Sequence, residues 1–300
     1  MSIMKKLKQQ DYWRIGLIPS SAKDIIKSDL SKFEIKWFSF TEKDFEADPF
    51  IFEIKGKQYI AYEIFDYDHG NGKIACADLD GNHHDFFNDI NKITGHKSYP
   101  FVFENDGDIF AVAETGDLNE VTLYKFNGEQ FEKAKVLLTG EKFVDTTIKK
   151  FNNTFYLFTS TIDGPFKQQL FYSDSLFGDF TKHPASPIAN SIKCGRNGGS
   201  IIEDESYLYR IGQNCERTYG GSLTIMKITT LTKDAYKEEW FKEIMPVAPF
   251  SDGIHTLSSW GDTTVIDSKN ILTRNLNIYR KIKYLLMVKL GIEKAFKLNV

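Results

Sequence analysis

The sequence predicts an all-β fold, a five-bladed β-propeller, from an internal repeat and from the hairpins inside each copy. A sixteen-residue pattern recurs at 48–63, 99–114 and 145–160, with a fainter copy at 198–213 and a degenerate fifth copy that begins near His255. The first four copies start 51, 46 and 53 residues from one another. Repeats of this length are typical of arrays and propellers.

Each copy contains two β-rich runs joined by a short turn. In the first copy these runs are 50–54 and 58–62, separated by Lys55-Gly56-Lys57. Such a pattern predicts a β-hairpin. Further β-rich runs follow, such as 73–77 and 121–126. Four strands per repeat form one propeller blade, and five repeats form a ring. The alternative, a stacked β-solenoid, needs shorter repeats without hairpins.

The N-terminal region predicts two strands, at 12–18 and 33–40, where apolar and polar residues alternate. The fifth copy, at 257–267, is short. We therefore expect an N-terminal strand to join the last blade and close the ring. This interpretation divides the chain into a propeller over 1–272, with the ring-closing strand in 1–47, and a tail over 273–300.

The tail is predicted to be a short, basic, amphipathic helix. Six Lys and Arg residues stand against one Glu in 276–300, a local charge of +5, which leaves −8 for the rest of the chain. The apolar residues of the predicted stripe are Ile278, Ile282, Leu285, Leu286, Val288, Ile292 and Phe296. Two interpretations stay open: a helix packed on its own propeller, or an interfacial helix that contacts an anionic inner membrane leaflet.

Composition narrows the class of protein. A content of 41% hydrophobic and 14% aromatic residues in 300 suits one globular propeller, and a net charge of −3 gives no case for nucleic acid. The three cysteines lack a CxxC spacing, so neither a disulfide framework nor a zinc site is indicated. Residues 1–14 contain no apolar run of seven or more, so we expect no secretory signal and a cytoplasmic location; no run of eighteen apolar residues occurs in the sequence.

The repeat also predicts where polar side chains meet, because the first strand of every blade lines the axis. The leading positions hold Asp48, Tyr99, Asp145, Gly198 and His255, and the trailing positions hold Glu63, Glu114, Ser160 and Gln213. A carboxylate in an apolar strand costs folding free energy unless it is paired with another group or serves a function. Paired carboxylates suit acid–base work on an acetal. The alternative is turn chemistry at the two aspartates and a structural ion pair at Glu63.

A second cluster lies in the fourth repeat. It contains Arg196, Arg217 and Tyr219, together with the pairs 198–199 and 220–221 of glycines. Glycines allow close approach of backbone to a ligand, and arginines can bind a carboxylate, phosphate or sugar diol. Alternatively, the glycines form bulges and the arginines pair with the acidic cluster. His255 would bind substrate or an axial ion, or be structural; no other cofactor is expected.

Several motifs carry a family resemblance over about residues 12–268. They are Ala47-Asp48-Pro49-Phe50, Ser98-Tyr99-Pro100-Phe101, Val144-Asp145-Thr146-Thr147, Gln213-Asn214-Cys215 and Gly253-Ile254-His255-Thr256. Together they resemble the N-terminal propeller domain of glucosamine inositolphosphorylceramide transferases and, more distantly, the furanosidase propellers of glycoside hydrolase family 43. The latter resemblance implies that Asp48 is the general base or nucleophile, that Asp145 tunes it, and that a later blade supplies the acid.

The implied position of the acid is occupied here by Arg196-Asn197-Gly198-Gly199. Glu114 is the substitute that we predict, with Glu63 as the second choice. An arginine at this position favours glycosyl transfer or recognition over simple hydrolysis.

The leading hypothesis is therefore a carbohydrate-active enzyme that transfers or hydrolyses a sugar in surface polysaccharide or glycolipid assembly. Its catalytic residues would be Asp48, Glu114 and Asp145, and a nucleotide- or lipid-linked sugar would contact Glu63, Tyr99, Arg196, Gln213, Arg217, Tyr219 and His255. The alternative is a non-catalytic glycan-binding propeller that presents substrate to a partner enzyme. A carboxylate with a raised pKa in a dry pocket, next to an ionised one, would favour catalysis.

Overall fold

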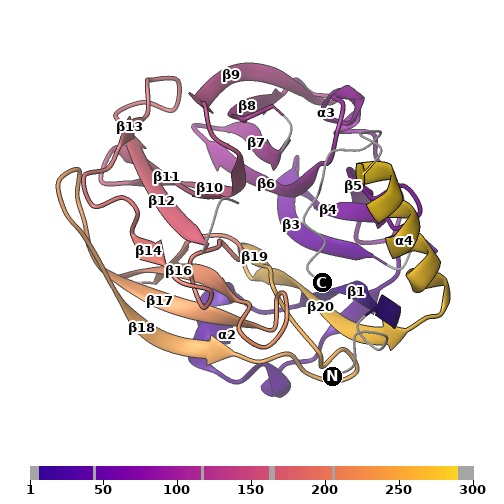
Figure 1. Ribbon diagram of the computed structural model, residues 1–300. Coiled ribbons are helices and arrows are strands. Elements are labelled where there is room, and N and C mark those ends of the chain that lie inside the picture. The colour runs from indigo at the N-terminus through magenta and orange to yellow at the C-terminus, as the bar shows by residue number, and fades with distance from the viewer. Residues whose placement is uncertain (1–6, 43–44, 116–117, 162–165, 205–206, 290–300) are drawn as a thin grey trace.

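The protein is a five-bladed β-propeller. The structure, a computed structural model, describes residues 7–42, 45–115, 118–161, 166–204 and 207–289. Five antiparallel sheets surround a central axis (Figure 1), which confirms the predicted fold class.

Four of the blades follow the chain in order. Blade 1 consists of β3 (Glu46–Ile54), β4 (Lys57–Asp66) and β5 (Asn71–Asp78), and blade 2 of β6 (Ser98–Asn105), β7 (Asp108–Glu114), β8 (Glu120–Phe126) and β9 (Phe131–Thr139). Blade 3 consists of β10 (Phe143–Phe151), β11 (Thr154–Thr161), β12 (Lys167–Ser173), β13 (Thr181–Lys182) and β14 (Ala189–Asn190). Blade 4 consists of β15 (Ile202–Asp204), β16 (Tyr207–Asn214), β17 (Ser222–Leu231) and β18 (Tyr236–Ile244).

Blade 5 closes the ring with both ends of the chain. Its order is β19 (Leu257–Trp260), β20 (Thr263–Thr273), β1 (Gln9–Ile18) and β2 (Lys36–Phe38). β1 pairs with β20 from Gln9 opposite Thr273 to Ile18 opposite Thr264. The N-terminal strand therefore joins the last blade, as the short fifth repeat predicted. This pairing satisfies backbone groups that would otherwise form an exposed sheet edge.

Aromatic and aliphatic side chains fill the space between neighbouring blades. One cluster joins Phe50 of blade 1 to Phe101 and Phe110 of blade 2 and to Phe155 of blade 3. All four rings are at least 95% buried. Each contributes roughly 1.5–3 kcal/mol of hydrophobic stabilisation. The packed faces hold the inner strands rigidly around the axis.

The outer parts of the blades differ from the expectation of four strands each. Among its described residues blade 1 has three strands, and His83 makes a single bridge to Ala77 where a fourth would lie. The helix α3 (Asn88–Lys92) follows and buries Ile90. In blade 3, β13 and β14 both pair with β12, at different places along it.

Two short helices interrupt the N-terminal region where the sequence predicted strands alone. The helix α2 (Ala22–Lys27) is capped by Ser21, whose side chain accepts a hydrogen bond from the Asp24 amide, and a 3-10 helix follows at Leu30–Lys32. α2 buries Ile25 and Ile26 against the core of blades 4 and 5. The strand predicted at 33–40 is consequently reduced to β2.

The helix α4 (Leu276–Lys289) follows β20 and lies beside blade 1 (Figure 1). The rest of the predicted helical tail, including Ile292 and Phe296, lies outside the described residues. Within the part of the chain that the structure describes, no helix combines the length and the apolar character required to cross a bilayer.

Candidate active site

The first strands of blades 1, 2 and 3 begin with the same backbone irregularity. The pairing between β3 and β4 shifts between Ala47 and Phe50, so that two residues oppose one, and equivalent shifts occur in β6 and β10. The first bulged residues are Asp48, Tyr99 and Asp145, with φ of 49°, 47° and 51°. Non-glycine residues rarely adopt this left-handed conformation, and such strain is concentrated at functional sites. The repeat thus encodes a bulge that redirects three side chains at one end of the axis.

Asp48 connects blade 1 to blades 2 and 5. Its Oδ1 accepts a hydrogen bond from the Thr256 hydroxyl at 2.8 Å, and its Oδ2 accepts one from the Tyr99 amide at 3.3 Å. Burial, with the charges of Asp145 and Asp267, raises the pKa of Asp48 to about 6, although His255 acts in the opposite direction. The carboxyl is 95% buried, so its surroundings govern its ionisation.

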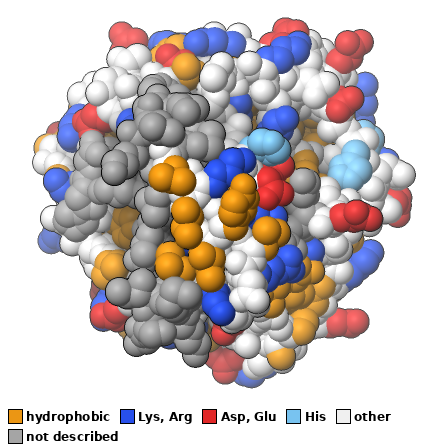
Figure 2. Space-filling view, turned by 45° about the vertical axis from the view of Figure 1, so that its right-hand side comes forward, with side chains coloured by type: hydrophobic (Ala, Val, Ile, Leu, Met, Phe, Trp, Pro, Cys, Tyr) orange, Lys and Arg blue, Asp and Glu red, His pale blue; other side chains and the backbone are white. Residues whose placement is uncertain are grey.

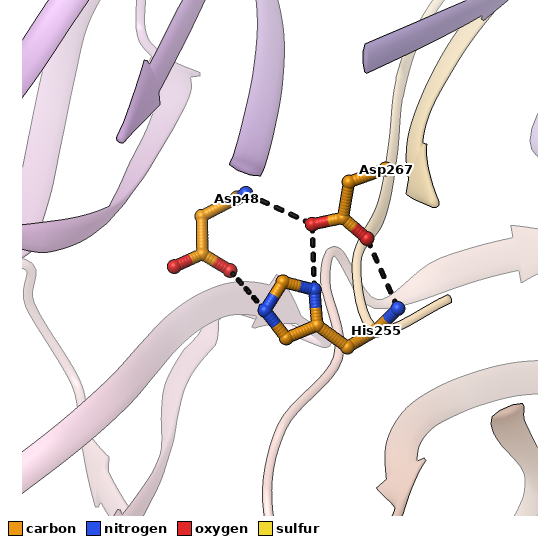
Figure 3. Close-up of side chains that lie close together, drawn as sticks. All are labelled: Asp48, His255 and Asp267. Atoms are coloured by element: carbon orange, nitrogen blue, oxygen red, sulfur yellow. Dashed lines mark hydrogen bonds and ion pairs between the residues drawn. The ribbon is translucent and has the colours of Figure 1, made fainter. Parts of the chain in front are cut away.

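His255 lies between two carboxylates (Figure 3). Its Nδ1 is 2.6 Å from Asp267 Oδ2 and its Nε2 is 3.6 Å from Asp48 Oδ1, while its ring stacks on Trp13 at 4.1 Å. Burial by itself would lower the pKa of His255, but Asp267 and Asp48 outweigh it and raise that pKa. The imidazole therefore lies between the two aspartates, in surroundings that favour its protonated form.

The same three side chains are candidate metal ligands. One ligand atom from each of Asp48, His255 and Asp267 lies within 4.8 Å of the others, and all three residues are buried. One imidazole nitrogen and carboxylate oxygens are a donor set that a cation could use. A protonated His255, which the raised pKa favours, would itself supply a positive charge between the carboxylates. The axial ion that the sequence suggested stays a prediction.

Asp145 is held by Arg196 from the segment before blade 4. The guanidinium donates from Nε to Asp145 Oδ2 and, at 3.4 Å, from Nη2 to Oδ1. Asp145 is 99% buried, and the Arg196 guanidinium lies 5.3 Å from the centre of the Tyr219 ring. A two-point ion pair of this kind fixes the positions of both side chains.

The surroundings of Glu114 are opposite to those of Asp145. Glu114 is 92% buried, and its Oε2 has no hydrogen-bond partner among the described residues. Burial, the largest cause, and the charges of Asp145 and Asp48 raise the pKa of Glu114 to about 8, even though Arg196 lowers it. Glu114 is therefore mostly protonated at neutral pH.

Glu63 has a neighbour that the sequence did not indicate. Its Oε1 lies 3.4 Å from His96 Nε2, and His96 Nδ1 accepts a hydrogen bond from the Gly72 amide at 2.9 Å. Burial, with the charges of Arg196 and Lys97, lowers the pKa of His96 to about 4, so its imidazole is neutral. Since Nδ1 accepts, the hydrogen is on Nε2 and faces Glu63. Burial and the charges of Asp48 and Glu114 raise the pKa of Glu63 well above its ordinary value.

The structure thus brings together the four acidic residues that the repeat singled out. Glu63 and Glu114 each respond to the charges of both Asp48 and Asp145, as their shifted pKa values show. The side chains come from blades 1, 2 and 3 and meet at one axial mouth.

Three of the side chains predicted to contact substrate instead bind other groups of the protein. Tyr99 is fully buried, and its hydroxyl accepts from the Gly199 amide at 2.8 Å and bonds Thr147, which joins blades 2, 3 and 4 across the axis. Gln213 is 99% buried and donates to the Asn197 carbonyl. Arg217 is exposed and donates to backbone carbonyls, among them that of Asp252.

The glycine pairs of the fourth repeat approach protein backbone. Gly199 has a φ of 137°, and a Cβ there would lie 1.9 Å from the Leu257 carbonyl oxygen. A Cβ at Gly220 would lie 2.6 Å from the Cβ of His255. These glycines allow blade 4 to pack closely on blade 5, and Arg196 pairs with the acidic cluster. For the glycines and Arg196, the alternative that the sequence left open describes the structure better.

Buried acidic side chains that meet at one mouth of a five-bladed propeller define a class of protein with a polar axial site. The chain belongs to the family described as glucosamine inositolphosphorylceramide transferase 1, N-terminal, whose model matches residues 27–246. This confirms the first resemblance that the motifs indicated.

Two plant relatives illustrate the extent of the match. The chain is 31% identical over 205 residues to glucosamine inositolphosphorylceramide transferase 1 of Oryza sativa subsp. japonica, which covers 65% of this chain and 28% of the rice protein. It is 30% identical over 151 residues to the protein of that name from Arabidopsis thaliana, covering 48% and 20%. The chain thus matches less than a third of the length of these curated relatives.

Solved structures of glycoside hydrolases resemble the fold. An exo-β-1,3-galactanase from Clostridium thermocellum gives a TM-score of 0.52 at 14% identity and covers 69% of this chain and 52% of the other. A GH43 β-1,3-galactosidase with galactodeoxynojirimycin gives 0.53 at 11% identity, covering 71% and 83%. At these identities the likeness concerns the propeller fold alone.

Proposed function

We propose that this propeller acts on a sugar or glycoconjugate at its axial carboxylate site, by glycosyl transfer or hydrolysis. The family match and the names of its relatives support a sugar substrate. The acidic cluster supports chemistry at an acetal, which requires a proton donor near a second carboxylate.

One observation carries the proposal: two buried carboxyls of the same cluster have opposite surroundings. Burial raises the pKa of Glu114 to about 8, while Arg196 pairs with Asp145 at both carboxylate oxygens. A buried carboxyl that keeps its proton near an ion-paired carboxylate is the arrangement expected of an acid and a stabilising anion in an active site.

The roles follow from these surroundings. Glu114 would donate its proton to the glycosidic oxygen as the bond to the anomeric carbon breaks. Asp48 would attack that carbon, or take the proton of the incoming hydroxyl. Asp145, paired with Arg196, would stabilise the positive charge that develops on the sugar. Glu63 and Tyr219 would contact the substrate.

Transfer is favoured over hydrolysis by two features. The relatives are named transferases, and the carboxyls of Asp48, Glu114 and Asp145 are each at least 92% buried. A site that excludes water favours a sugar or lipid hydroxyl as the acceptor. We further propose that the donor is nucleotide- or lipid-linked and that the reaction takes place on the cytoplasmic side of a membrane.

The test replaces Asp48 by Asn. Asn tolerates the left-handed conformation and keeps the shape of the side chain, so the melting temperature should change little while turnover is abolished. Asp106→Asn is a matched control, because Asp106 is exposed and has a φ of 54°. Turnover would be sought with UDP- and GDP-sugars and with aryl glycosides. Full activity of Asp48→Asn would contradict the catalytic assignment.

A glycan-binding propeller without catalysis is the second candidate. It is favoured by Arg196 at the position where the resemblance implies the acid, and by the hydrogen bonds that already occupy both oxygens of Asp48. In that case the wild type would bind glycans in calorimetry without turnover, and Asp48→Asn would alter affinity alone.

A further inference from the structure

We propose that the outward face of α4 is a docking surface for an anionic lipid bilayer. This outer face consists of Leu276, Tyr279, Ile282 and Leu286, with Lys283 beside them. The inference is independent of the axial chemistry, because it rests on the helix alone.

The opposite side of α4 is attached to the propeller. Arg280 donates to Asp68 at 2.6 Å and to Gln10 at 3.1 Å. Asn277 is 97% buried and donates to the Gln9 carbonyl. These contacts hold the helix against β1 and the turn after β4, so its orientation on the propeller is fixed.

The orientation leaves the large apolar side chains of the outer face towards solvent. Leu276 is 55% exposed, Tyr279 67%, Ile282 47% and Leu286 54%. Spacings of three, three and four residues place them on one side of the helix. Figure 2, turned so that this side of the molecule comes forward, shows hydrophobic side chains gathered beside lysines and arginines. A helix that served only to cover its own propeller would direct this stripe inward.

The charge of α4 selects the partner. Arg280 is paired with Asp68, but Lys281, Lys283 and Lys289 are also basic, and the helix contains no acidic residue. Apolar side chains flanked by lysines are the pattern of helices that lie in the interface of anionic membranes. Tyr279 also suits the headgroup region, since its ring is apolar and its hydroxyl is polar.

A second copy of the chain fits this surface less well. A two-fold contact would place the same basic residues of both helices against each other. Four side chains on one helix face also fall well short of the roughly 800 Å² per partner that a stable interface buries. A lipid surface needs no matching partner shape, so the bilayer is the occupant that we infer.

The experiment is co-sedimentation of the full chain with phosphatidylcholine vesicles that contain 0 or about 30% phosphatidylserine, at low and high salt. Binding should require the anionic lipid and weaken with salt. Lys283→Gln should reduce the partition coefficient about fivefold, the effect of one basic residue near the surface. The double variant Ile282→Ser, Leu286→Ser should reduce it at least tenfold, because two apolar side chains no longer insert.

The matched control is Trp240→Ser. Trp240, on β18 of blade 4, is 65% exposed, and its replacement should leave vesicle binding unchanged. Circular dichroism of each variant checks that the propeller remains folded. The proposal is overturned by absence of binding to the anionic vesicles at low salt, or by equal binding of the double variant and the wild type. It is also overturned if light scattering shows a dimer that the double variant loses while vesicles bind neither protein.

Discussion

Glu114→Gln should stabilise the folded protein at neutral and alkaline pH. Burial raises the pKa of Glu114 from 4.5 to about 8, with Asp145 and Asp48 adding to the effect. Glutamine has the shape of the protonated acid and has no proton to lose. The variant therefore removes the cost of keeping this carboxyl neutral or of ionising it in the folded state.

The sign and size of the effect follow from linkage. When folding raises the pKa of a carboxyl, the free energy of unfolding of the protein falls as the pH rises from the unfolded pKa to the folded pKa. Between pH 4.5 and 7 the loss is about 3 kcal/mol, at 1.36 kcal/mol per pH unit. Above pH 8 it reaches its limit of about 5 kcal/mol. The free energy of unfolding of the variant, minus that of the wild type, should grow by these amounts.

Urea unfolding at pH 5, 7 and 9 measures this difference. Because each comparison is made at one pH, the titrations of other groups, His255 among them, largely cancel. Glu132→Gln is the control, since Glu132 is an exposed carboxyl of the same blade. It should leave the pH dependence unchanged. If the curves of Glu114→Gln and the wild type ran parallel from pH 5 to 9, Glu114 would not be a buried neutral acid, and its role as proton donor would fail.

The remaining predictions concern catalysis, pairing and ring closure. With pKa values of about 6 for Asp48 and about 8 for Glu114, kcat/KM should be highest between these values, and a flat profile from pH 5 to 9 would refute the pairing of base and acid. Arg196→Met should lower the free energy of unfolding in urea by about 3–5 kcal/mol, because Asp145 is left buried and unpaired. Adding Asp145→Asn should recover much of this loss, whereas strictly additive losses would contradict the ion pair. Deletion of 1–40 removes β1 and should give aggregated protein, whereas a soluble product with a cooperative melt would show that the ring closes without it.

The ring of blades was predictable because its signals are local and repeated. A hairpin requires only two β-rich runs and a turn, and five similar units can bury their faces only against one another. The closing strand was also predictable, since the short fifth repeat needed a partner. The alternation at 12–18 supplied it, and β1 covers this run.

The short helices were not predictable in the same way. α2 spans six residues and α3 five, too few for a clear helical period. They form because Ile25, Ile26 and Ile90 reach the cores between blades. Tertiary packing, which a linear pattern does not contain, decides such elements.

For the site, the repeat located the residues and the structure supplied their partners. Asp48, Glu114 and Asp145 come together because the bulge and the turn-back position recur in each repeat. Asp267 carried the same signal as the others, a carboxylate in an apolar strand, but it does not occupy a repeat-equivalent position. His96 carried no signal, because it lies in the segment between two blades and becomes relevant only when folding places it against Glu63.

The family resemblance implies an acid at the position where this chain has Arg196. This difference affects how the site can hold a proton. A free guanidinium beside Glu114 would favour the ionised carboxylate and remove the donor. Here the guanidinium is bound to Asp145, so its charge is largely balanced, and burial controls the pKa of Glu114. The neutral imidazole of His96, whose Nε2 lies 3.4 Å from Glu63 Oε1, adds no further cation on that side. Arg196 is therefore compatible with the proton donor that we propose in blade 2, provided that Asp145 remains its partner.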